Sequence, residues 1–138
     1  PNCFPADESM HTMLIGMIVD TAGWRAQPDT IESLMQESTA FASFVYEGQM
    51  HIRLVIDRLT VYKNDALAPD YIAGCPDDVD GDVQSTKLEL LGFAGQRGEV
   101  PFQAVTLLYT GCRNTNWGGI AGGIGSMCGQ QFNRANPE

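Results

Sequence analysis

The strongest constraint on the fold is a change in apolar periodicity across the first half of the chain. Residues 13–19, Met-Leu-Ile-Gly-Met-Ile-Val, form a short apolar run that ends in Asp20, as a strand buried on both faces does. After Pro28, apolar residues recur at helical spacing, and from His51 to Tyr62 they alternate with polar ones. A strand, a helix and a second strand in this order favour a parallel pair joined by a crossover.

The helix between these strands is expected to begin at residues 28–30, where Asp29 or Thr30 can cap its free N–H groups. Gly48 is its expected stop, because glycine enters the left-handed conformation freely. Ser43 is expected to lie off the apolar stripe. The stripe itself is expected to comprise Ile31, Leu34, Met35, Phe41, Phe44 and Val45.

The second half of the chain continues the alternation of strands and helices. A loop over 64–82 precedes a short helix over 85–93, which is expected to be broken by Gly92, Gly95 and Gly98. A buried strand follows over 104–109, and then a glycine-rich apolar segment over 118–128. The order predicts an α/β fold with a mostly parallel sheet flanked by helices.

The length of 138 residues fits one domain, 1–138, with an irregular lead-in over 1–9 and a loose tail over 130–138. The chain has 17 acidic and 8 basic residues, which gives a net charge of −9. This balance argues against binding to nucleic acid, whose affinity depends on neutralised phosphates. The apolar runs are too short for a membrane span.

No catalytic residue is assigned from the usual patterns of nucleophiles and bases. His11 and His51 do not begin a His-Glu-x-x-His motif, and no serine stands in Gly-x-Ser-x-Gly. The four cysteines are widely spaced and form no Cys-x-x-Cys pair: Cys3, Cys75, Cys112 and Cys128. They predict two disulfides in an oxidising compartment, with three pairings open; the alternative is four buried thiols in a reducing one.

Acidic residues are densest just before the second helix. Asp78, Asp80 and Asp82, with Glu89, have the spacing of ligands at positions one, three, five and twelve of a calcium loop. Val83 occupies the position at which that loop requires glycine, so a solvated acidic loop is the alternative.

The glycine-rich segment 118–123 lacks the Gly-Lys-Ser/Thr ending of a phosphate-binding loop. Backbone with few side chains lets another backbone approach closely. The segment therefore predicts either an edge strand that accepts an extended peptide or a tightly packed turn.

Several stretches together resemble the amino-terminal part of the catalytic domain of adamalysin-like (reprolysin) zinc metallopeptidases, in the metzincin clan. Residues 13–20 are similar to the family's first strand, and 41–46 with 51–56 resemble its helix followed by an N-I-x-L-x-L strand. Residues 88–97 are similar to L-x-x-F-x-x-W-R, with Gln96 where tryptophan is usual. Residues 105–112 resemble x-x-L-L-T-G, and 119–128 resemble G-x-A-x-x-G-x-M-C. The resemblance covers residues 10–129.

This resemblance implies a twisted, mostly parallel sheet whose last strand runs antiparallel along the rim of the active-site cleft and pairs with substrate. The role of substrate-binding edge would fall on Gly119, Ile120, Ala121, Gly122, Gly123, Ile124 and Gly125. The family's zinc motif, His-Glu-x-x-His-x-x-Gly-x-x-His, should follow, but the sequence ends at Glu138 without it. Zinc would therefore come only with a missing carboxyl-terminal half, and no zinc ligand is assigned.

The resemblance thus implies a secreted, catalytically incompetent fragment of a zinc metallopeptidase. Its expected partner is another polypeptide: the missing catalytic half, an extended peptide or copies of itself. Apolar surface at Ile120, Ile124, Met127 and Phe132 would be left for such a partner. The alternatives are a non-catalytic binding or structural module on the same scaffold, and a small α/β domain unrelated to peptidases.

Overall fold

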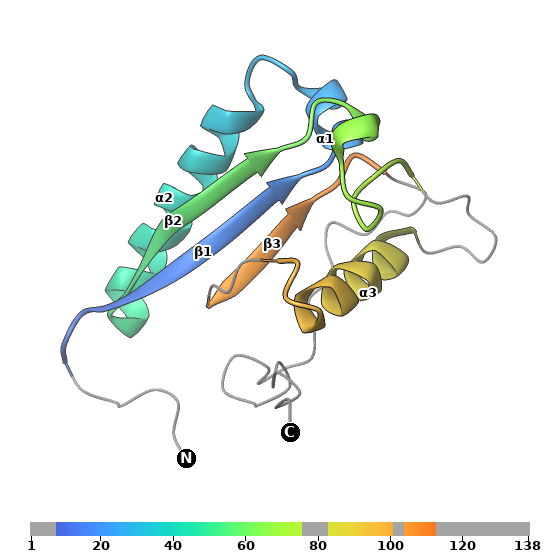
Figure 1. Cartoon of the computed structure of the whole chain (residues 1–138). Helices are drawn as coiled ribbons and strands as arrows, with labels where there is room; N and C mark the ends of the chain where they lie inside the picture. Colours follow the sequence, from blue (N-terminus) through green and yellow to red (C-terminus); the bar gives the residue numbers. More distant parts are fainter. Residues whose placement is uncertain (1–7, 76–82, 101–103, 113–138) are drawn as a thin grey trace, which may run out of the picture.

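The computed structural model describes residues 8–75, 83–100 and 104–112 of the chain (Figure 1). The described elements are β1 (His11–Val19), α1 (Thr21–Ala26), α2 (Ile31–Met50), β2 (Ile52–Val61), the 3₁₀ turn η1 (Asp65–Leu67), α3 (Val83–Gln96) and β3 (Val105–Tyr109).

The three described strands form one parallel sheet in the order β2-β1-β3. The α/β class and the parallel pairing predicted from periodicity are therefore confirmed. The central strand β1 is buried on both faces from Ile15 to Val19, as the apolar run 13–19 predicts for these residues, but Leu14 of the same run is 45% exposed. The strand at 104–109, also predicted to be buried, is only half-buried as β3, and its Leu107 is 43% exposed. The antiparallel edge strand expected at 119–125, the tail 130–138 and most of the lead-in lie outside the described residues.

Helix α2 covers one face of the sheet. Its Ile31 and Met35 pack against Ile15, Met17 and Val19 of β1, which are alternate residues and so share a face (Figure 1). This cluster is one of two hydrophobic cores in the described part of the chain.

The predicted apolar stripe of α2 is wrong at Phe41 and Phe44, which are 72% and 77% exposed. The face turned to the sheet carries Thr39 and Ser43 instead, four and eight residues after Met35. The Ser43 hydroxyl accepts a hydrogen bond from the backbone N–H of Leu54 in β2. A polar anchor to the sheet therefore sets the rotation of the second half of α2.

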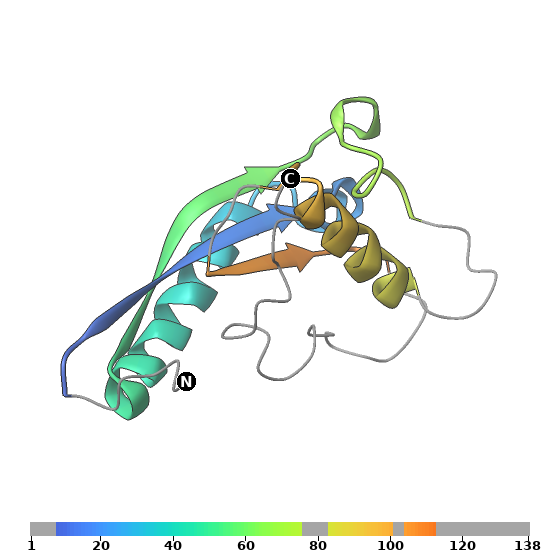
Figure 2. The same cartoon turned by 60° about the horizontal axis from the view of Figure 1, so that its bottom comes forward.

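Helix α3 covers the other face, at the carboxyl end of the strands (Figure 2). Leu91 and Ala94 of α3 pack against Ile18 of β1, together with Tyr71 and Ile72 from the segment that follows η1. The helices thus lie on opposite faces, and the sheet between them is doubly covered.

Both long helices continue past the glycines that were predicted to end them. Helix α2 runs through Gly48 to Met50, and His51 takes the left-handed conformation with φ 54°. Helix α3 runs through Gly92 and Gly95 to Gln96. No atom lies within 4 Å of a Cβ built on these helical glycines, so they carry only the propensity cost of glycine in a helix. Gly98, with φ 74°, does follow the end of α3 as predicted.

Candidate functional site

The carboxylate of Asp20 is the centre of a buried polar cluster at the carboxyl end of the sheet. Asp20 follows β1, and its Oδ1 accepts the N–H of Gly23 at 2.6 Å and that of Gly111 at 3.1 Å. Its Oδ2 accepts the Lys87 Nζ at 2.7 Å and the Thr110 Oγ1 at 2.5 Å. Two donors on each oxygen use the acceptor capacity of an ionised carboxylate in full.

Lys87 brings a positive charge into this interior from α3. The side chains of Lys87 and Asp20 are each 1% exposed. Besides the carboxylate, the Lys87 Nζ donates to the carbonyl oxygen of Ile72 at 2.9 Å. Burying either charge alone is strongly unfavourable, so the two side chains depend on each other.

Two glycines let the chain after β3 touch the start of α1. A Cβ on Gly111 would lie 2.3 Å from the carbonyl carbon of Ala22, and one on Gly23 would lie 2.9 Å from the Tyr109 ring. The first of these contacts is with backbone, which does not move aside easily. The cluster around Asp20 therefore requires glycine at position 111.

A disulfide joins Cys75 to Cys112 beside the cluster, with a Cα–Cα distance of 5.4 Å. This pair confirms one disulfide, while Cys3 and Cys128 lie outside the described residues. The Cys112 sulfur lies 3.7 Å from the Asp20 Oδ2; a disulfide sulfur carries no hydrogen, so this is a packing contact. Closing a separation of 37 residues stabilises the fold by roughly 4 kcal/mol in the chain-entropy model.

The cluster occupies the topological switch point of the sheet. The connection from β1 leads to β2 on one side, and the next connection passes back to β3 on the other side. In doubly wound sheets the crevice between two such strands, at their carboxyl ends, is the usual ligand site. In this chain Asp20 and Lys87 are both fully buried, so their ion pair fills that crevice and holds β1, β3 and α3 together.

Of the site residues predicted from the sequence, Cys75 and Cys112 are the described pair that the structure brings together. The substrate-binding candidates 119–125 and the calcium candidates Asp78, Asp80 and Asp82 lie outside the described residues. Glu89 is exposed on α3.

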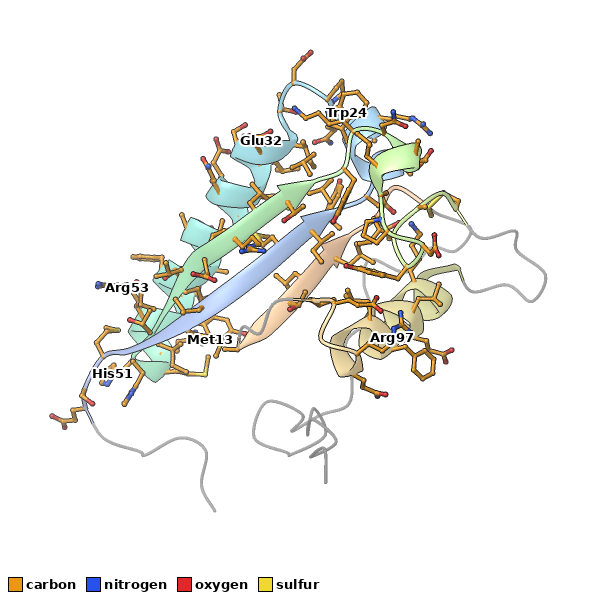
Figure 3. All side chains as sticks on the ribbon, viewed as in Figure 1. Met13, Trp24, Glu32, His51, Arg53 and Arg97 are labelled. Carbon is orange, nitrogen blue, oxygen red and sulfur yellow. A yellow bond between two sulfur atoms is a disulfide. The ribbon has the colours of Figure 1, made fainter. Side chains whose placement is uncertain are left out.

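The two histidines lie at the amino end of the sheet, where the N–H of His11 donates to the carbonyl of His51 at 2.8 Å. Figure 3 shows His51 at the opposite end of the sheet from Trp24 of α1. Within the described ranges, no three His, Cys, Asp or Glu side chains gather as a group able to hold a metal.

Neither a model of a known protein family nor a curated protein matches the chain. Of the described helices, none combines the length and the hydropathy that a bilayer span requires.

Sequence reasoning missed the Asp20 cluster, although two signals for it were present. Asp20 and Thr110 each follow a predicted strand, and the carboxyl ends of parallel strands meet at one edge of a sheet. Lys87 precedes Leu91 and Ala94 by four and seven residues, on the apolar face of its helix. A lysine in an apolar stripe indicates a buried counter-ion.

Proposed function

We propose that the chain is the sheet-bearing part of a secreted, adamalysin-like zinc metallopeptidase. It contributes the sheet and the substrate-binding edge strand and is catalytically incompetent alone. The observation that carries this proposal is the strand order β2-β1-β3, which leaves β3 at the edge of the described sheet. The glycine-rich segment 119–125 follows β3 closely in the chain.

The proposed edge strand follows from the position of β3. In the proposal, residues 119–125 return beside β3, and a connection this short produces an antiparallel neighbour. The outer N–H and C=O groups of that neighbour then pair with an extended peptide, and the glycines allow the two backbones to approach closely. Substrate is thus recognised mainly through its backbone.

The described residues do not fit a zinc site, so no chemical step is assigned to zinc. Cys75 and Cys112 are joined in a disulfide and offer no thiolate. His11 begins β1 and His51 directly precedes β2, and among the described residues neither belongs to a group of three side chains able to hold a metal. In the proposal the zinc ligands therefore belong to a separate or downstream segment.

Secretion is supported by the disulfide between Cys75 and Cys112, because such bonds persist mainly in oxidising compartments. The second candidate function is a non-catalytic module that uses the same edge for assembly with another polypeptide. Phe41 and Phe44 favour an assembling protein: they stand three residues apart on α2, so they are neighbouring exposed apolar side chains that a partner would cover, on that helix and not at the β3 edge.

The test has two arms. The purified chain, supplied with zinc, is assayed for cleavage of unstructured peptides, and hydrogen exchange of residues 119–125 is followed as peptide is added. We expect no cleavage but slower exchange, and a Gly122→Pro variant, which lacks one N–H, should lose the protection while Gly48→Ala retains it. Zinc-dependent cleavage by the isolated chain, or exchange that peptide leaves unchanged, would overturn the proposal.

The sequence of the encoding transcript separates the two candidate functions. A His-Glu-x-x-His motif downstream of Glu138 supports the peptidase fragment. A stop codon directly after Glu138 supports the non-catalytic module.

A further inference from the structure

A surface groove of about 190 Å³ lies on the face of the sheet that carries α3. We call it the Gly16 groove, because Gly16 of the central strand contributes backbone alone to its floor. Arg58, Thr60, Tyr71, Glu99 and Thr106 are among the residues that line it. Of these residues, Arg58 and Thr60 come from β2 and Thr106 comes from β3, while Glu99 follows the carboxyl end of α3.

A register shift in the sheet places Arg58 in this groove. Ile15 pairs with Ile56, but Gly16 pairs with Arg58, so that Asp57 is passed over. In unbroken register, residue 58 would stand opposite residue 17 and share the face that packs on α2. Such bulges re-aim side chains and are enriched beside functional sites.

Arg58 differs from the other described arginines in its electrostatic surroundings. Arg25 pairs with Asp65 at 3.0 Å, Arg53 pairs with Glu47 at 3.1 Å, and Arg97 pairs with Glu99. Figure 3 shows Arg53 and Arg97 at opposite sides of the molecule. Within the described part of the chain, the Arg58 guanidinium has no carboxylate partner, although the chain carries a net charge of −9.

The remaining lining suits a negatively charged group. The two carboxylate oxygens of Glu99 accept hydrogen bonds from Nε and Nη2 of Arg97, whose positive charge offsets that of Glu99. Burial is the largest cause that raises the pKa of the Tyr71 phenol, and the neighbouring Tyr62 and Glu99 raise it further. Tyr71 therefore remains neutral and keeps its hydroxyl proton. Arg58 supplies the unbalanced positive charge, beside the hydroxyl side chains of Thr60 and Thr106.

We propose that the Gly16 groove binds a carboxylate group, held by the Arg58 guanidinium. A guanidinium presents parallel N–H donors that match the two oxygens of a carboxylate. The volume of 190 Å³ corresponds to roughly six water molecules of about 30 Å³ each. This space accepts a small organic acid or one acidic side chain of a polypeptide. The inference does not depend on the proposed function.

Titration of the isotope-labelled chain followed by NMR tests this inference. The probes are succinate, its neutral diamide, a tripeptide with a central glutamate and the matching glutamine tripeptide. We expect the carboxylate probes to shift the Arg58 side-chain signal and the Thr60 and Thr106 amides, and the neutral probes to shift none of them. Binding by succinate indicates a small acid as the ligand, whereas binding by the glutamate peptide alone indicates a polypeptide side chain.

Substitutions test whether carboxylate binding depends on Arg58 itself or on positive surface charge in general. Arg58→Gln should weaken binding roughly tenfold or more, the effect of losing a charge-assisted hydrogen bond. Arg53→Gln, on the same strand but outside the groove, is the matched control and should leave the affinity unchanged. Arg58→Lys should be intermediate, because it retains the charge but not the paired donors. Unchanged affinity in Arg58→Gln, shifts confined to other residues, or no response to either carboxylate probe would each overturn the inference.

Discussion

Replacing Lys87 by methionine should destabilise the fold more than any surface charge change. The substitution keeps the length and apolar stem of the side chain but removes the ammonium group that lies 2.7 Å from the Asp20 carboxylate. The carboxylate then remains buried with three neutral donors, from Gly23, Thr110 and Gly111. These hydrogen bonds persist, but the charge has no counter-ion.

The size of the effect follows from the burial of both partners. Removing one partner of a buried ion pair costs about 3–5 kcal/mol. The three remaining donors to Asp20 place Lys87→Met near the lower end, at about 3 kcal/mol. Asp20→Asn should reach the upper end, about 5 kcal/mol, because the new amide N–H₂ group faces other donors and leaves Lys87 with the Ile72 carbonyl. For 138 residues these values correspond to Tm decreases of about 10 and 17 °C.

Thermal and urea unfolding, followed by circular dichroism, measure these differences. The double variant Asp20→Asn/Lys87→Met should cost several kcal/mol less than the sum of the single variants, because it leaves no isolated charge. Lys63→Met is the matched control; its pair with Glu32 spans 3.9 Å between side chains that are each 60% exposed, and its loss should leave Tm nearly unchanged. Additive costs, or a Lys87→Met variant as stable as the parent, would refute the reasoning.

Three further predictions concern backbone conformation and acid stability. Gly111→Ala should lower Tm strongly because its Cβ would meet backbone at 2.3 Å, whereas Gly92→Ala, with open space around it, should stabilise α3 by about 1 kcal/mol; equal Tm values for the two variants would contradict this. His51→Gly should stabilise the chain in urea by about 1 kcal/mol, because φ 54° is unfavourable for a residue with a Cβ, and a loss of stability would contradict the strain. The hydrogen bond from Arg53 is the main cause that holds the pKa of Glu47 below 4.5, so its stabilisation is present above pH 4.5 and is lost as the pH falls through the lower folded-state pKa. Glu47→Gln should therefore flatten the acid side of a stability–pH curve measured by urea unfolding, and parallel curves for variant and parent would contradict it.

The strands were predictable because their signal is local. The apolar run at 13–19 and the alternation at 51–62 each depend on side chains that one sheet face or both must bury. In the structure β1 begins at His11, two residues earlier than the predicted run at 13–19. The second strand is Ile52–Val61, one residue shorter at each end than predicted. Their parallel pairing was predictable because a helix connects the two strands.

The errors arose where tertiary contacts outweigh local preference. Hydrophobicity alone placed Phe44 on the buried stripe, but the bond from Leu54 to the Ser43 hydroxyl turns the serine inward. Helix α1 was not predicted; it begins at the Asp20 carboxylate, which caps the N–H of Gly23. That carboxylate is held in place by Lys87, far away in the sequence, and no local pattern conveys such a contact.

The sealed switch point also determines where this fold has room to bind other molecules. Asp20 and Lys87 fill the crevice that a doubly wound sheet ordinarily offers to ligands, so the two binding sites that we propose, the Gly16 groove and the edge beyond β3, lie outside it. The same contacts fix the exit of β3, because Thr110 and Gly111 are tied to Asp20 and Cys112 is tied to Cys75. An edge strand that aligns an extended peptide must hold its register against the sheet. In the proposal, a cluster that locks the residues directly after β3 meets this requirement, and the buried ion pair at its centre has a structural role.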